Sequence, residues 1–351
     1  MKRLQSFDVV KAFACMAIVV LHFRQVNTSG LSICIQALTR FAVPTFLMIS
    51  GFFLFGAVDE RRACRALRKI VLIVLSASVF YLFFHTVFVG WTMNSCAKIF
   101  SRAHVLEFFF TNRPFVYLHL WYLGALIYCY ITVLLLWSSW GKRLLCCALP
   151  FLLIGMAFSQ EFKEAAPIVP SIRVAVDFWV WWGHIYLFRA LPFFVSGFLL
   201  AAIKSKLANV PRIELVCILM ALLGCVSSLL EAFFIKSKDV QFYIGSYVTA
   251  LALVAWASQC QKSCFGVLSY IGLRLSLLVY ILHIAVGNMY NRYLAHACDG
   301  ALIKSTLRPL GVLLCTLIVS QIVLVLWRLL ALGVCRLGYG ISRDGHVGQG
   351  K

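Results

Sequence analysis

Residues 7–23 read FDVVKAFACMAIVVLHF and form the first long apolar segment of the chain. Within this segment, Asp8, Lys11 and His22 recur at helical spacing, with Cys15 and Ile18 between them on the same stripe of an α-helix. A helix rises about 1.5 Å per residue, so His22 lies roughly 16 Å beyond Lys11. If the charged pair lies at a membrane surface, this imidazole is well inside a hydrocarbon layer about 30 Å thick.

The composition explains why a membrane is the expected surrounding of this helix. Of 351 residues, 62% are hydrophobic and 13% are charged, and the mean hydropathy is +0.93. No soluble domain can turn that much apolar surface inward, so we predict a polytopic membrane protein. The net charge of +20 falls mostly in short loops between apolar runs, which indicates contact with anionic lipid headgroups and not with nucleic acid.

Hydropathy predicts an all-α polytopic transmembrane bundle of about ten helices, with both termini in the cytoplasm. We expect one integral-membrane domain over residues 1–351. Its last part, residues 335–351, is expected to be a short cytoplasmic tail. The expected spans are 8–26, 34–57, 70–91, 118–138, 144–158, 185–203, 213–234, 242–258, 268–291 and 309–333.

The distribution of lysine and arginine sets the predicted direction of insertion. With a cytoplasmic N-terminus, the inside segments carry a dense basic cluster at residues 61–69, whereas basic residues outside are diluted by acidic ones. The positive-inside bias therefore favours two cytoplasmic termini. The sequence shows no convincing internal repeat, which weakens a transporter interpretation based on inverted repeats.

The 14 cysteines lie mostly inside apolar segments, where they behave as small hydrophobic residues. Cys260 and Cys264 form a CxxxC pattern with no second ligand pair beside it, so we expect no metal site.

His22 is the first candidate for chemistry. It could be a core histidine bonded to a neighbouring helix, with Asp8 and Lys11 as ordinary interfacial residues. Ionisable groups at this depth are costly, however, and usually indicate a functional site. Because a neutral imidazole accepts a proton near pH 7, His22 is suited to act as a general base.

A second candidate region, residues 41–70, reads FAVPTFLMISGFFLFGAVDERRACRALRKI. Pro44 is expected to kink or open its helix, and Ser50 with the following glycine allows close approach of a helix or ligand. Arg65 and Arg68 are three residues apart and could grip a phosphate bidentately. An ordinary cytoplasmic basic loop, or a loop that binds headgroups, explains the same residues.

Three further segments carry polar residues at the ends of apolar runs. His119 and Tyr122 lie at the expected outer start of the fourth span, where an aromatic belt accounts for the tyrosine but not for the histidine. Arg189 precedes a segment that Pro192 should break. Arg189 and Arg40 could both simply extend to the outer headgroups.

The ninth span carries a second polar stripe. Ser276, Tyr280 and His283 follow one another at steps of four and three, so they share one face of an apolar helix that ends in a deep histidine. Each residue has an ordinary structural explanation. Because two such polar stripes occur in one bundle, a functional role explains them better than coincidence does.

Taken in order, these segments resemble the integral-membrane acyltransferase 3 family, which includes bacterial O-acyltransferases of cell-surface glycans. The first helix has the family's acid, basic residue and histidine as Asp8, Lys11 and His22, with lysine where the family usually has arginine. Arg65-Ala66-Leu67-Arg68 is similar to the family's cytoplasmic RxxR. Four blocks, VPTFLMISGFFL, HLWYLGALI, LPFFVSGFLL and SLLVYILH, follow in the family's order, and the likeness runs over about residues 5–330.

The resemblance implies transfer of an acyl group, commonly acetyl, from acyl-CoA to a hydroxyl of an envelope glycan or its lipid-linked precursor, in the bacterial inner membrane. It implies a catalytic His22, with Asp8 and Lys11 organising access of the donor and with Arg65 and Arg68 on the CoA. We further expect the other polar residues to bind the acceptor or the oxyanion; these are Arg40, Ser50, His119, Tyr122, Arg189, Ser276, Tyr280 and His283.

Two other classes of protein remain open at this stage. A transporter or exporter would use the same stripes as a proton relay or solute path. A catalytically inert assembly or sensor protein of the envelope is the third class. The arginine pair and the ordered blocks favour the acyltransferase, while the acyl group and the acceptor stay open.

Overall fold

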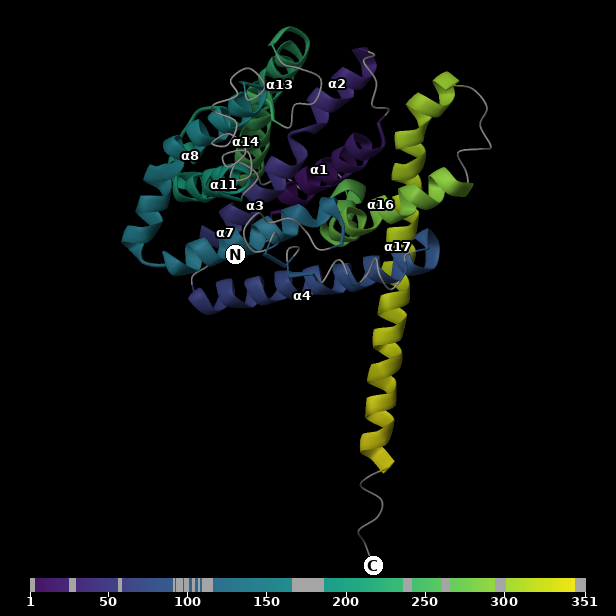
Figure 1. Cartoon of the computed structure of the whole chain (residues 1–351). Helices are drawn as coiled ribbons and strands as arrows, with labels where there is room; N and C mark the ends of the chain where they lie inside the picture. Colours follow the sequence, from purple (N-terminus) through teal and green to yellow (C-terminus); the bar gives the residue numbers. More distant parts are fainter. Residues whose placement is uncertain are drawn as a thin grey trace, which may run out of the picture.

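A computed structural model describes residues 4–24, 30–55, 59–90, 116–165, 186–235, 242–260, 266–293 and 301–344, with residues 92, 97, 101–102, 105–106 and 108 between them. Its described elements are helices (Figure 1). They are α1 (Gln5–Phe23), α2 (Gly30–Thr39), α3 (Ala42–Phe55), α4 (Glu60–Phe84), η1 (His85–Val89), η2 (Leu118–Leu120), α7 (Trp121–Leu135), α8 (Ser139–Ala165), α10 (Tyr186–Arg189), α11 (Leu191–Ala202), α12 (Lys204–Ala208), α13 (Ile213–Leu230), η4 (Glu231–Ile235), α14 (Ile244–Gln259), α15 (Gly266–Tyr270), η5 (Ile271–Leu275), α16 (Ser276–Tyr293) and α17 (Ala301–Asp344).

The predicted all-α bundle is confirmed. Within the described ranges, eight helical stretches are long and apolar enough to cross a membrane, and two shorter apolar helices, Leu191–Ala202 and Ile244–Gln259, join them. Each of the ten lies on one of the ten spans expected from hydropathy. The chain is therefore a polytopic helical bundle.

The second expected span is divided between α2 and α3, and the break does not lie where we expected it. Arg40 and Phe41 separate the two helices, whereas Pro44 lies in the first turn of α3. A proline there lacks an N–H that would have no helical partner in any case, so it begins the helix instead of kinking it. The break brings Arg40 to the junction of two helices.

The sixth span is also divided, here as expected. Arg189 ends the short helix α10, and α11 begins at Leu191 with Pro192 in its first turn. Proline favours this position because its fixed φ suits the start of a helix.

The basic cluster at residues 61–69 is helical and is not the loop that we expected. Asp59 caps α4 by accepting a hydrogen bond from the amide of Arg61 at 2.9 Å, and the helix then continues to Phe84. A side-chain cap of this kind satisfies one of the free amides at a helix start. Arg65 and Arg68 thus lie on the same helix as Tyr81, and both arginines are exposed.

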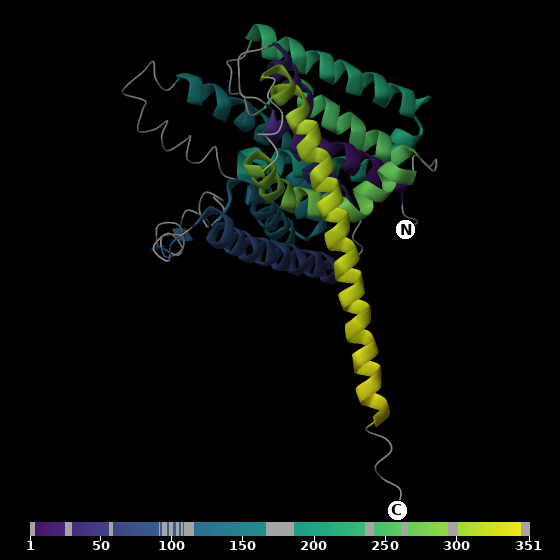
Figure 2. The same cartoon turned by 90° about the vertical axis from the view of Figure 1, so that its right-hand side faces the viewer.

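At the other end of the chain, the expected C-terminal tail is largely helical. Residues 335–344 continue α17, and the last seven residues, 345–351, lie outside the described part. In both views the C-terminal half of α17 extends away from the other helices (Figures 1 and 2).

Helix α1 lies in the middle of the bundle, where it contacts α2, α3, α14, α15, η5, α16 and α17. Among the eight long stretches it is the most buried, at 67%. Both views draw the start of α4 on the same side of the bundle as the start of α1 (Figures 1 and 2). Helix α1 is therefore largely surrounded by the other helices of the bundle.

Candidate active site

Three histidines from distant parts of the chain meet at the end of α1. His22 lies on the last turn of α1, His119 on η2 and His283 on α16. The ring centroids of His22 and His283 are 5.1 Å apart, and those of His119 and His283 are 5.2 Å apart. We call these three residues the histidine cluster. The sequence predicted each of them separately, and the fold brings them together.

The members of the cluster differ in how accessible they are. His283 is 0% exposed and His119 is 5% exposed, whereas the side chain of His22 is exposed. A buried imidazole can only act on its neighbours, but an exposed one can be reached by a ligand. His22 is therefore the member that can meet a substrate directly.

Tyrosines surround the buried histidines. Tyr280 donates a hydrogen bond to the backbone carbonyl of His119, and its ring lies 5.4 Å from that of Tyr122. Both tyrosines were predicted site residues. Tyr122 also forms a hydrogen bond with Ser50, whose hydroxyl donates to the carbonyl oxygen of Phe46 at 2.9 Å.

Sequence reasoning missed two aromatic neighbours of His119, Tyr81 and Tyr117, and a third ring, His85, that contacts both of them. The Tyr81 ring lies 4.9 Å from His119, and its hydroxyl donates to the carbonyl oxygen of Ile281 at 2.5 Å. Tyr117 lies 5.2 Å from His119 and stacks on His85 at 5.0 Å. Tyr81 and His85 are four residues apart on consecutive turns of one span, and that spacing was the signal that could have found them.

The orientation of His283 is fixed by its own helix. Its Nδ1 lies 2.7 Å from the carbonyl oxygen of Tyr280 and 3.2 Å from that of Val279. Because a carbonyl oxygen only accepts, Nδ1 must carry the proton, and the neutral ring then has an acceptor lone pair at Nε2.

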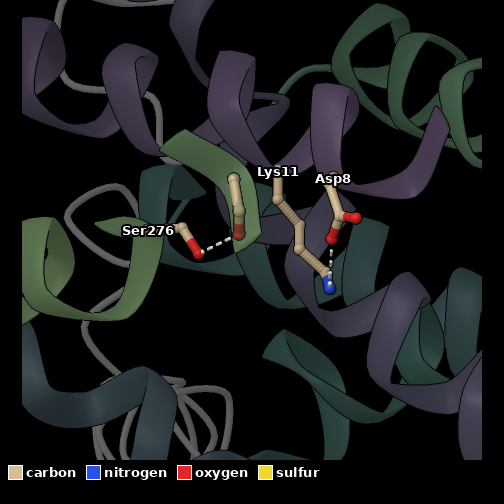
Figure 3. Close-up of polar contacts among 4 residues, drawn as sticks. Asp8, Lys11 and Ser276 are labelled. Carbon is tan, nitrogen blue, oxygen red and sulfur yellow. Dashed lines mark hydrogen bonds and ion pairs between the residues drawn. The ribbon is translucent and has the colours of Figure 1, made fainter. Parts of the chain in front are cut away.

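The charged end of α1 forms a separate site. Lys11 Nζ lies 3.6 Å from Asp8 Oδ1, and their side chains are 27% and 5% exposed (Figure 3). Lys11 also lies 5.8 Å from the centroid of the Phe53 ring. The predicted pair of Asp8 and Lys11 is thus an ion pair on the inside of the bundle.

Ser276 belongs to this charged end and not to the histidine cluster. Its hydroxyl donates to the carbonyl oxygen of Gly272 at 2.7 Å (Figure 3), and Gly272 packs directly on the backbone of Asp8. The polar stripe of the ninth span is therefore divided: Ser276 lies beside the ion pair, His283 lies beside His22, and Tyr280 lies beside His119.

The middle of the α1 stripe is closed by packing. Cys15 is 0% exposed and Ile18 is 2% exposed, and each lies in a hydrophobic cluster with residues of other helices. The stripe that joins Lys11 to His22 in the sequence is consequently not an open path along α1.

Arginines lie next to His22 on the side away from the ion pair. Arg24 and Arg40 both act on His22 electrostatically, and Arg40 acts on Arg189 in the same way. Arg24 donates to Gln36 Oε1 and to the carbonyl oxygen of Leu21, both at 2.8 Å. Arg40 and Arg189 were predicted from the sequence, but Arg24 was missed because it follows directly after the apolar run.

The predicted donor-binding arginines lie far from the histidines along α4. Arg65 Nε donates to the carbonyl oxygen of Arg61 at 3.3 Å, so its guanidinium lies along the helix surface. Tyr81 follows Arg68 by thirteen positions on α4, which is about 20 Å at the helical rise. Among the described residues, no group of three histidine, cysteine, aspartate or glutamate side chains is arranged to hold a metal ion.

Comparison with known proteins places this architecture in a family. A model described as an acyltransferase domain matches residues 4–327, nearly the whole chain. A protein of Enterococcus faecalis named amino-acid racemase is 24% identical over 346 residues, which are 93% of this chain and 47% of that protein. The chain thus spans about half the length of this curated relative. No solved structure matches the chain.

The family model covers every helix from α1 to the apolar part of α17, and it includes both the ion pair and the histidine cluster. The match covers nearly the whole bundle and not one helix or motif, and the spans have the expected number and order. The chain is an integral membrane protein that belongs to the acyltransferase 3 family.

Proposed function

We propose that this protein transfers an acyl group, acetyl in the first instance, from acyl-CoA to a hydroxyl of a cell-envelope glycan or its lipid-linked precursor. The observation that carries the proposal is the exposed imidazole of His22 beside two buried histidines, inside a membrane acyltransferase of this family. A general base requires a neutral imidazole that the substrate can reach and that neighbouring side chains hold in place.

In the proposed reaction, His22 removes the proton of the acceptor hydroxyl as the oxygen attacks the thioester carbonyl carbon. A carbon–oxygen bond forms, the carbon–sulfur bond of the thioester breaks, and the proton held by His22 passes to the departing CoA sulfur. The products are an ester on the sugar and free CoA. General base catalysis of this kind contributes about 10²- to 10⁴-fold to a rate.

We assign the donor to the side of the bundle where α1 and α4 begin. Arg65 and Arg68 are exposed there and would hold CoA phosphates, which suit the planar guanidinium fork. Asp8 and Lys11 would order the same end of the bundle, with Ser276 beside them. Acyl-CoA is a long molecule, so its phosphates can lie at the arginines while its thioester lies at His22.

We assign the acceptor to the opposite end of α1. Arg40 acts electrostatically on both His22 and Arg189, and each of these arginines lies at a helix break. Ser50 of α3 and Tyr122 of α7 interact with each other. Hydroxyl and guanidinium groups can orient a sugar and any acidic group attached to it. His119 and Tyr280 would support the reacting groups from behind.

The test is the acyl content of the surface glycans of the producing bacterium. A strain lacking this protein is complemented with the wild type, with His22→Ala or with His346→Ala, and the glycans are compared by mass spectrometry. We expect the deletion and His22→Ala to lose one acyl mass and His346→Ala to keep it. The lost mass identifies both the acyl group and the acceptor.

A second arm of the same experiment concerns the donor. Arg65→Ala/Arg68→Ala should retain transfer in membrane vesicles but require a higher concentration of labelled acetyl-CoA, because two phosphate contacts are lost. A fully active His22→Ala protein would rule the proposal out. Movement of a solute into liposomes without any dependence on acyl-CoA would instead support a transporter.

A further inference from the structure

If His22 is the general base, as in the proposed function on which this inference rests, His283 is the member of the histidine cluster that can orient it. His283 cannot rotate freely, because its Nδ1–H is shared between the carbonyl oxygens of Tyr280 and Val279 on its own helix. Its Nε2 is on the opposite side of the ring and points away from the α16 backbone. That nitrogen is a fixed acceptor in the interior of the bundle.

Nε2 of His283 needs a donor. Within the described part of the chain, neither this nitrogen nor the two ring nitrogens of His119 have a hydrogen-bond partner, although the Ile281 backbone lies beside the His119 ring. Buried polar atoms in native proteins are almost always hydrogen-bonded, to protein or to ordered water. The ring centroids of His22 and His283 are 5.1 Å apart, which is close enough for one water to bridge a His22 N–H and this nitrogen.

We propose that His283 is a positioning residue for His22, and that its Nε2 accepts a hydrogen bond from one bridging water, which in turn accepts one from a ring N–H of His22. This bond selects the tautomer of His22. It leaves the lone pair of the other His22 nitrogen free to face the acceptor hydroxyl. The arrangement gives the base an orienting group behind it, as hydrolase triads do with a carboxylate.

The proton balance of this arrangement is simple. When His22 takes the hydroxyl proton it becomes an imidazolium, and its N–H toward His283 becomes a stronger donor. His283 stays neutral and keeps its own Nδ1–H on the backbone carbonyls. The proton from the hydroxyl then leaves His22 for the CoA sulfur, and both rings return to their starting state.

The other groups that face His22 do not offer an acceptor whose direction is fixed by hydrogen bonds to the backbone. Arg24 at the end of α1 and Arg40 between α2 and α3 are donors only. His119, on η2, is nearer to His283 and packs among Tyr81, Tyr117 and Tyr280. His283 is therefore the neutral acceptor whose direction is fixed.

The experiment compares His283→Leu with His283→Gln in membrane vesicles of the producing bacterium, with radiolabelled acetyl-CoA as the donor. Leucine fills the space without an acceptor, whereas the glutamine carbonyl can accept the same hydrogen bond. We expect His283→Leu to lower kcat by about 100-fold or more while KM for acetyl-CoA changes by less than about threefold, and His283→Gln to recover about tenfold of the loss.

Two further measurements separate a positioning role from packing. Histidine-selective ¹⁵N spectra of the vesicle-embedded protein should show one His22 tautomer in the wild type and a mixture in His283→Leu. The double variant His22→Ala/His283→Leu should be no slower than His22→Ala, because residues that act as a unit are not additive.

The outcomes are distinct for the two proposals. Equal kcat in His283→Leu and the wild type, with His22→Ala inactive, overturns the positioning role alone. So does an equal loss in the leucine and glutamine variants that follows the amount of folded protein. Full activity of His22→Ala, or no labelled product from the wild type, overturns the proposed function itself.

Discussion

Asp8 is a carboxylate with a side chain only 5% exposed inside a membrane bundle, so its charge must be compensated locally. The ammonium of Lys11 at 3.6 Å supplies part of that compensation, and it is itself 27% exposed. Since both residues lie one turn apart on α1, the pair forms as soon as the helix does.

We expect Lys11→Met to lower the free energy of unfolding by about 1–2 kcal/mol, a value reduced from that of a fully buried pair because Lys11 is partly exposed. Asp8→Asn/Lys11→Met should regain most of the loss, since the buried charge is removed with its partner. Unfolding in detergent, followed by circular dichroism, measures both. Lys11→Arg is the control that keeps the charge, and equal stability of the single and double variants would contradict the expectation.

At this scale, the sequence revealed residues but not their neighbours. His22, His119 and His283 were detectable because an ionisable group in an apolar span is costly. Their meeting depends on the packing of three helices, which periodicity does not encode. Tyr81 escaped notice because a tyrosine in an apolar helix has no such cost, although it lies beside His119.

Among the elements, α3 and α11 make one of the closest helix contacts in the protein. Gly51 on α3 lies against the backbone of Phe194, and Gly197 on α11 lies against the backbone of Met48. Small residues allow membrane helices to approach to backbone contact, where van der Waals packing stabilises their association. This contact holds Ser50 and Ser196, the neighbours of the two glycines, inside the bundle.

Gly197→Ala should therefore destabilise the protein, because the added methyl group would collide with the carbonyl group of Met48. Overpacking of this kind costs about 1–3 kcal/mol. Thermal unfolding of the detergent-solubilised protein measures the effect. Gly30→Ala at the start of α2 is the matched control, since a methyl group there meets no atom within 4 Å; an equal melting temperature for both variants and the wild type would refute the argument.

The sequence predicted the elements well where one long apolar run makes one span, as in α13. It also predicted that the Ser50-Gly51 pair permits close approach, but not that α11 is the helix that approaches it. The break at Arg40 and Phe41 was not predicted, because neither residue is a strong helix breaker. The α4 start was missed because a capped basic helix and a basic loop have the same composition.

For the whole molecule, the distribution of charge predicts two cytoplasmic termini. The fold adds which helix starts lie on the same side of the bundle as the N-terminus. The start of α4, with its exposed arginines, lies on the same side of the bundle as the start of α1 (Figures 1 and 2). The positive-inside rule predicts that this side faces the cytoplasm. The donor end of the proposed reaction then faces the cytoplasm, where acyl-CoA is made.

Reporter fusions test this orientation. Green fluorescent protein fused after Lys351 or within residues 261–265 should fluoresce, and alkaline phosphatase at the same sites should be inactive. Within residues 236–241 the pattern should reverse, since that segment is expected outside. Each site carries both reporters as its own control, and active phosphatase after Lys351 would show that the orientation is wrong.

The central place of α1 has a consequence for how the protein is made. Ser6 donates a hydrogen bond at 2.6 Å to the carbonyl oxygen of Ala257, which is 251 residues later in the chain. At synthesis rates of about 5–20 residues per second, α1 waits roughly 13–50 s for that partner. Helix α1 can thus pack on α2 and α3 early, but its contacts with α14, α15, η5, α16 and α17 form only when those later segments have been made. Until then, its charged end must be sheltered by lipid headgroups or the insertion machinery.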